Sequence, residues 1–153
     1  MKLAEALNLR ADLRRRIEQL RARLLQNAKV QEGDVPQELP DELMIELNDC
    51  LTRFEALITA INLTNVCVAD VDGTTMTALI ARRDALTLRL SVLRDFINEA
   101  GSLVTRHSSS EIKIRSSVDV RALQGELDNY SKELRELNTK IQSLNWMTEL
   151  ECF

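Results

Sequence analysis

The last third of the chain carries the pattern that most limits its fold. Between residues 119 and 145, an apolar residue recurs on alternating three- and four-residue steps. This heptad spacing places one apolar stripe along a long α-helix, and such a stripe is buried by packing against another helix. Asp119 directly precedes the stripe and is placed to cap the N-terminus of the helix. The stripe consists of Val120, Leu123, Leu127, Tyr130, Leu134, Leu137, Ile141 and Leu144.

Three earlier segments have the same helical spacing, at about residues 2–28, 41–65 and 75–100. The chain of 153 residues contains only 4 Gly and 2 Pro, so few residues interrupt helices. Its length is that of one ordinary domain. We therefore predict an all-α fold, an antiparallel bundle of four long helices that forms a single domain over residues 1–153. The fourth helix of this bundle covers residues 119–145.

Composition and charge exclude several classes of function. The net charge of −4 argues against nucleic acid as a partner. No apolar run approaches the roughly 18–20 residues of a membrane span, and the N-terminal residues lack the pattern of a secretory signal. The three cysteines are odd in number and lack CxxC spacing, which favours a reducing compartment. We expect a cytoplasmic protein without a cofactor, a membrane partner or an identified small-molecule ligand.

The segment "SSSEIKIRSSVDV" at 108–120 departs from the helical spacing. Ile112 and Ile114 fall on one side of an extended chain, and basic residues fall on the other. We predict a short extended arm near 110–116, in which Ile112 and Ile114 form an interaction arm. Residues 66–70 alternate in a similar way. The sequence leaves open whether the 66–70 and 110–115 segments pair as strands.

Apolar residues also occur outside the predicted stripes. Helices about 35–40 Å long bury one stripe inside a monomer. The additional residues are explained either by a wider apolar face within one bundle or by an interface between subunits. We predict a homo-oligomer whose size and symmetry the sequence does not determine. The residues concerned are Leu9, Leu25, Leu88 and Val92.

Three carboxylates in the second helix are candidate metal ligands. Glu42, Glu46 and Asp49 have a spacing of i, i+4, i+7, which brings them near one helical face. Helical Mg²⁺-dependent phosphohydrolases use such arrays. Here the array lies beside the apolar stripe, whereas a metal site inside a bundle needs inward carboxylates, so a solvated face is favoured. A metal-dependent phosphohydrolase is therefore the alternative function, and no catalytic residue is assigned.

Polar residues on or near the stripes form a predicted polar core. Arg83 stands in the middle of the third helix on its apolar stripe, where it needs an acidic partner or a water-filled cavity. Glu55 is the closest acidic candidate on the second helix, so we predict an Arg83–Glu55 contact, either within one chain or across an interface. The competing interpretation is that Arg83 extends to solvent from the edge of the stripe. Asn62 and Asn65 complete this predicted polar core.

Five stretches together resemble a small bacterial all-helical family, often labelled septicolysin, whose function is not established. The resemblance covers almost the whole chain and implies a compact helical protein. The label implies a membrane-active, cytolysin-like role, which is the third function considered. By this resemblance, the motif-dense end comprises Asn62, Thr64, Asn65, Arg82, Arg83 and Asp84. The stretches are "MKLAEALNLRADL" at 1–13, "LITAINLTN" at 57–65, "DGTTMTALIARRDAL" at 72–86, "SEIKIRSSVDV" at 110–120 and "IQSLNWMTEL" at 141–150.

The long heptad helices favour assembly, and no motif favours catalysis. The leading prediction is therefore a cytoplasmic, self-associating helical protein with a non-catalytic structural or interaction role.

Overall fold

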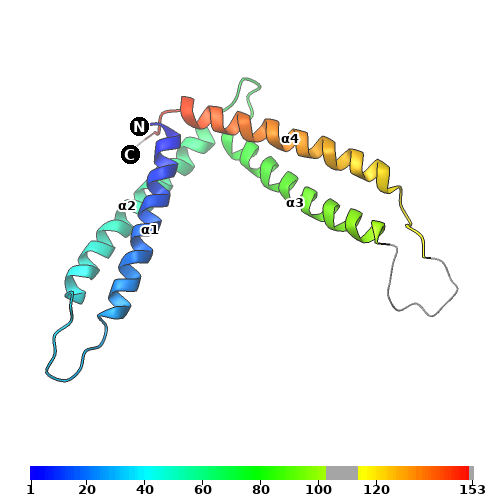
Figure 1. Cartoon of the computed structure of the whole chain (residues 1–153). Helices are drawn as coiled ribbons and strands as arrows, with labels where there is room; N and C mark the ends of the chain where they lie inside the picture. The colour runs from blue at the N-terminus through cyan, green and yellow to red at the C-terminus, as the bar shows by residue number, and fades with distance from the viewer. Residues whose placement is uncertain (103–113, 152–153) are drawn as a thin grey trace. The chain divides into compact units, whose positions relative to one another are not determined.

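The computed structural model describes residues 1–102 and 114–151, and all regular secondary structure in these residues is helical (Figure 1). The predicted all-α fold with four long helices is confirmed, and each predicted helix overlaps an observed one. The helices are α1 (Leu3–Gln26), α2 (Pro40–Cys67), α3 (Met76–Gly101) and α4 (Val120–Met147).

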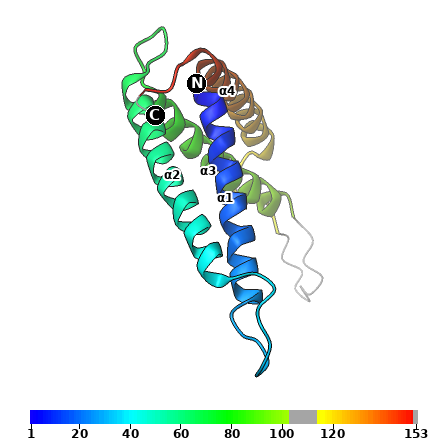
Figure 2. The same ribbon diagram turned by 90° about the vertical axis from the view of Figure 1, so that its left-hand side faces the viewer.

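The chain divides into two compact units. The first comprises Met1–Met76 with the C-terminal residues from Ser143, and the second comprises Thr77–Gln142. The first unit is built on α1 and α2, which run antiparallel and are joined by residues 27–39 (Figure 2). The second is built on α3 and most of α4, which also run antiparallel. The single domain over residues 1–153 stays a prediction.

The α1/α2 hairpin is closed by an apolar core. Leu20 of α1 is fully buried, and Leu43 and Cys50 of α2 are buried beside it. These positions recur at helical spacing on the inner faces of both helices, which explains why this pair forms. Pro40 stands at the start of α2, where its missing N–H leaves no helical hydrogen bond unmade. Ile17, Leu24 and Leu47 pack around this core.

The α3/α4 hairpin is held by the heptad stripe that the sequence predicts. Every residue of that stripe is buried or half-buried, and Leu137 and Ile141 are the most enclosed. The predicted cap of α4 is also confirmed, because the Asp119 carboxylate accepts a hydrogen bond from the Ala122 N–H at 3.0 Å. The buried residues of α3 are Met76, Leu79, Leu86, Leu90 and Ile97.

The connection between α2 and α3 contains a short antiparallel contact. The Met76 N–H donates to the Val68 carbonyl at 2.8 Å, and the Asp70 N–H donates to the Thr74 carbonyl at 2.9 Å. Gly73 makes the turn between them with φ of 79°, a value that residues with a Cβ rarely adopt.

The N- and C-terminal segments form an equivalent antiparallel contact, although no turn connects them. The Leu3 N–H donates to the Thr148 carbonyl at 2.9 Å, and the Leu150 N–H donates to the Met1 carbonyl at 2.8 Å. Thr148 follows α4 directly, as Val68 follows α2. The segment after each hairpin therefore pairs in the same way with the segment before a helix.

These matching contacts align α1 with α3 and α2 with α4. Helices α2 and α4 both have 28 residues, so their first and last residues coincide. Leu57 and Ile61 of α2 align with Leu137 and Ile141 of α4, and all four are buried. The chain thus contains two structural repeats. Residues identical in both include Arg10/Arg83, Leu13/Leu86, Arg16/Arg89, Leu20/Leu93, Leu43/Leu123, Glu46/Glu126, Leu47/Leu127 and Asn65/Asn145.

The two segments with alternating sequence, 66–70 and 110–116, form no regular strand within their described residues. Helix α2 continues to Cys67, so residues 66 and 67 are helical and not extended. The chain leaves the helix only at Val68, and Ala69 forms an isolated bridge with Thr75. Ile112 lies outside the described residues. Ile114 is exposed and has no regular secondary structure, and the role of these two as an interaction arm stays a prediction.

Candidate functional site

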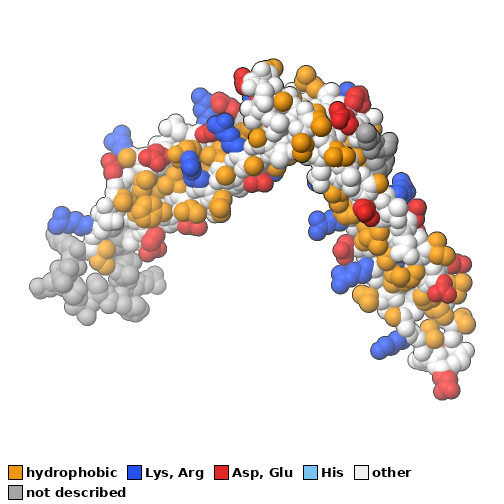
Figure 3. Space-filling view, turned by 180° about the vertical axis from the view of Figure 1, so that it is seen from behind, with side chains coloured by type: hydrophobic (Ala, Val, Ile, Leu, Met, Phe, Trp, Pro, Cys, Tyr) orange, Lys and Arg blue, Asp and Glu red, His pale blue; other side chains and the backbone are white. Residues whose placement is uncertain are grey.

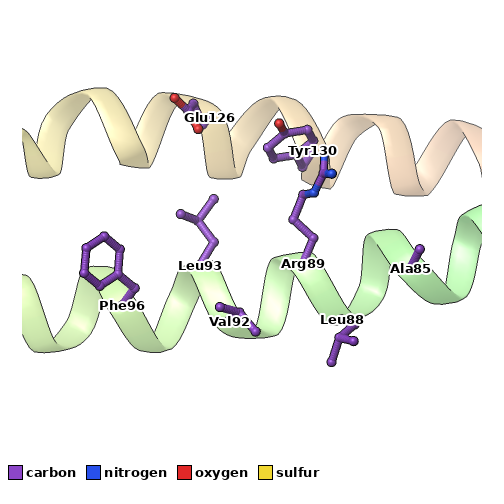
Figure 4. Close-up of a pocket in the computed structure, with 8 residues that line it drawn as sticks. All are labelled: Ala85, Leu88, Arg89, Val92, Leu93, Phe96, Glu126 and Tyr130. Atoms are coloured by element: carbon purple, nitrogen blue, oxygen red, sulfur yellow. The ribbon is translucent and has the colours of Figure 1, made fainter.

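A groove of about 600 Å³ runs along the α3/α4 hairpin (Figure 4). Its lining is apolar apart from one arginine, one glutamate and the tyrosine hydroxyl. In Figure 4, Leu93 and Arg89 extend from α3 toward α4, whereas Leu88 extends away from it. The lining residues are Ala85, Leu88, Arg89, Val92, Leu93, Phe96, Glu126 and Tyr130.

Three large apolar side chains of α3 form an exposed row beside the groove. Leu88 is 67% exposed, Val92 61% and Phe96 46%. They are spaced by four residues, so they lie one helical turn apart on one face. Hydrophobic side chains gather over this hairpin in Figure 3. Since burial of apolar surface contributes about 25 cal/mol per Å², this row favours a further partner.

The groove also contains two charged groups of opposite sign. The guanidinium of Arg89 lies 4.9 Å from the centre of the Tyr130 ring, a cation–π contact. Glu126 lines the same groove from α4, and we find no ion pair for it among the described residues. We call Leu88, Arg89, Val92, Phe96, Glu126 and Tyr130 the α3/α4 face.

The aligned positions of the α1/α2 hairpin carry a different surface. Arg16 aligns with Arg89 and Glu46 aligns with Glu126. Here the two charges meet, because Arg16 Nε donates to Glu46 Oε1 at 2.8 Å. At the position of Tyr130, α2 has the smaller residue Cys50, which is buried in the core.

The apolar row is replaced in the same hairpin by polar side chains. Arg15 and Gln19 stand at the positions of Leu88 and Val92, and Arg23 stands at that of Phe96. Arg23 Nε donates to Glu38 Oε2 at 3.0 Å, and this hydrogen bond lowers the pKa of the Glu38 carboxyl. The α1/α2 hairpin therefore presents a charged surface where the α3/α4 hairpin presents an apolar one.

The candidate metal ligands of α2 lie among arginines. Glu46 pairs with Arg16, as described, and Asp49 lies 3.7 Å from Arg53. Glu42 is exposed. Within residues 1–102 and 114–151, no group of three or more His, Cys, Asp or Glu side chains is close enough to hold a metal ion. Metal binding by these carboxylates stays a prediction.

The predicted polar core residues occupy different environments. Arg83 is half-buried and donates two hydrogen bonds to the neighbouring Asp84, at 2.9 and 2.7 Å. Glu55 and Asn62 are exposed, and Asn65 is half-buried. The predicted Arg83–Glu55 contact, within one chain or across an interface, stays a prediction.

Sequence reasoning missed Thr64 as a buried polar residue. Its side chain has no exposed surface, and its hydroxyl donates to the Ala60 carbonyl at 2.8 Å. The same hydroxyl oxygen accepts a hydrogen bond from the Glu151 N–H at 3.0 Å, which fixes the C-terminal segment. The sequence does indicate this burial, because Thr64 stands three residues after Ile61 and therefore lies on the same apolar stripe.

Residues 10–150 match the model of a family described as "Family of unknown function (DUF6847)". The chain belongs to this family. Its description carries no septicolysin label, so that part of the resemblance stays a prediction. No curated protein matches the chain.

Among solved structures, the DUF6847 chain is similar to a functionally unknown conserved protein from Corynebacterium diphtheriae. The two are 40% identical, with 99% of each chain covered and a TM-score of 0.91. The all-α fold is therefore shared with a crystal structure of a protein whose own function is unknown.

Proposed function

We propose that this protein is a self-associating helical protein with a non-catalytic structural or interaction role, as the heptad pattern predicts. The observation that carries this proposal is the exposed row of Leu88, Val92 and Phe96 along α3. Apolar side chains at one-turn spacing on a long helix are typical of surfaces that pack against another helix.

Other described helices support the same conclusion. Each has large apolar side chains that its hairpin partner does not cover. Of the four residues predicted off the stripes, Leu25, Leu88 and Val92 are exposed, whereas Leu9 is half-buried. An interface between subunits accounts for the exposed ones better than a wider internal face. Further exposed apolar residues are Ile45, Leu51, Leu63, Val66, Trp146 and Met147.

The two other functions have weaker support. A metal-dependent phosphohydrolase would require Glu46 and Asp49 to exchange their arginine partners for a metal ion. A membrane-active role, as the septicolysin label implies, would need apolar surface that enters lipid. Across the described part of the chain, no helix is long and apolar enough to cross a membrane.

Light scattering coupled to size-exclusion chromatography tests the proposal. We expect a particle mass of at least twice the chain mass of 17.4 kDa at micromolar concentration. A mass of 17.4 kDa over a hundredfold range of concentration would rule out self-association.

Titration with Mg²⁺ or Mn²⁺, followed by calorimetry, tests the phosphohydrolase: heat of binding that Glu46→Gln abolishes would favour it. Dye release from liposomes tests the membrane-active role.

A further inference from the structure

We propose that the α3/α4 face pairs with the same face of a second copy, related by a twofold axis. This inference rests on the proposed self-association and names the surface that carries it. Each face offers the same apolar row and one charge of each sign, so two identical faces are complementary.

The apolar row is arranged symmetrically about its middle residue. Val92 stands four residues from both Leu88 and Phe96, so a twofold axis near Val92 places Leu88 of one copy opposite Phe96 of the other. The row spans about 12 Å at 1.5 Å per residue, and the groove beside it is large enough to receive side chains from the second copy.

The two charges lie on opposite sides of this centre. Arg89 is on the Leu88 side of Val92, and Glu126 lies on α4 above Leu93, toward Phe96 (Figure 4). The same twofold axis therefore brings Arg89 of each copy toward Glu126 of the other. Two Arg89–Glu126 ion pairs form between the copies. Sliding one copy along the other would separate both pairs, so they favour a single register of the two helices.

The first hairpin shows why Glu126 is available for such a pair. At the aligned positions Arg16 and Glu46 bond to each other, and the neighbouring position on α2 is the small Cys50. In the second hairpin Tyr130 stands at that position, and its ring attracts Arg89. Glu126 is thereby left without a cation among the described residues, and the partner's copy of Arg89 supplies one.

Charge reversal in separate chains tests the pairing. Arg89→Glu places two glutamates at both predicted contacts, and Glu126→Arg places two arginines there. We expect each variant alone to self-associate at least tenfold more weakly than the unchanged chain in sedimentation equilibrium. An equimolar mixture of the two variants regains one Arg–Glu pair at both contacts, so we expect association within about threefold of the unchanged chain. Restoration by mixing requires contact between chains.

Arg16→Glu is the matched control, since Arg16 is the aligned residue of the first hairpin. It breaks the Arg16–Glu46 pair, and we expect it to leave association unchanged. Circular dichroism of every variant confirms that the helices are retained. If the unchanged chain is monomeric, the proposed function itself fails. If it associates but the mixture remains as weak as the single variants, self-association stands and the pairing of α3/α4 faces is overturned. Equal weakening by Arg16→Glu would also overturn it.

Discussion

Arg16 and Arg89 occupy aligned positions in the two hairpins, yet their guanidinium groups have different partners. Arg16 Nε donates to Glu46 at 2.8 Å, whereas Arg89 lies over the Tyr130 ring at 4.9 Å. The change from Cys50 to Tyr130 on the facing helix accompanies this difference. One hairpin satisfies its charges internally, and the other presents an open apolar face that we assign to assembly.

Shortening Leu20 tests the core of the first hairpin. Leu20→Ala removes a fully buried side chain that packs against Leu43 and Cys50, so it leaves a cavity. We expect the free energy of unfolding to fall by about 2–5 kcal/mol in urea denaturation. Gln19→Ala, at an exposed polar position of the same helix, is the control and should change it by less than about 0.5 kcal/mol. Similar effects of the two substitutions would contradict the assignment of the core.

The buried hydroxyl of Thr64 tests the attachment of the C-terminal segment. Thr64→Val keeps the shape but removes the acceptor of the Glu151 N–H, and we expect a loss of about 1–3 kcal/mol in unfolding free energy. Thr64→Ser keeps the hydroxyl and should retain most of the protection of the Glu151 amide against hydrogen exchange. Unchanged exchange at Glu151 in Thr64→Val would show that this hydrogen bond does not hold the segment.

Glu149 makes stability depend on pH. Its carboxylate lies 2.6 Å from Lys2 Nζ and 3.2 Å from the Met1 amino group. The hydrogen bond from Lys2, and then that from the amino group, lower the pKa of Glu149 below its ordinary value of 4.5. As the pH falls, Glu149 therefore takes up a proton in the unfolded chain before it does so in the folded chain. The stabilisation of the fold by this carboxylate is present above pH 4.5 and is lost as the pH falls through the lower pKa of the folded state.

The measurement is the thermal midpoint of the unchanged chain and of Glu149→Gln between pH 7 and pH 2.5. We expect the unchanged chain to melt at higher temperature at neutral pH, and the difference to shrink as the pH falls below 4.5. A difference that stays constant with pH would mean that the carboxylate charge does not stabilise the fold.

Substitution of glycine by alanine should have opposite effects on the free energy of unfolding at Gly73 and at Gly125. Gly73→Ala forces a Cβ onto a residue with φ of 79°, so we expect a loss of about 1 kcal/mol in unfolding free energy. Gly125 lies within α4, and a Cβ there would meet no atom within 4 Å. Gly125→Ala should therefore stabilise the chain by roughly 0.5–1 kcal/mol. Chemical denaturation of both variants measures these changes, and a gain from Gly73→Ala would contradict the turn geometry.

The sequence predicted the helices well because helical periodicity is a local signal. The heptad stripe from Val120 to Leu144 and the cap at Asp119 place α4 within two residues of its observed bounds. The alternation at residues 66–70 left the end of the second helix open, and in the structure α2 continues to Cys67 and ends at Val68. Two alternating residues fit a helix end as well as a strand.

The candidate surface was only partly visible in the sequence. Leu88 and Val92 stood out as apolar residues off the stripe, but the alignment of Arg16 with Arg89 required the matching hydrogen bonds at Thr148 and Val68. Two repeats with few identical residues are hard to recognise before their ends are known. The contact of Arg89 with the Tyr130 ring is a tertiary contact, so no periodic pattern in the sequence indicates it.

Sedimentation equilibrium of the unchanged chain at graded concentrations tests the central claim most directly. Self-association predicts a mass of at least 34.8 kDa, twice the 17.4 kDa of one chain, at micromolar concentration. A single species of 17.4 kDa at every concentration would contradict it.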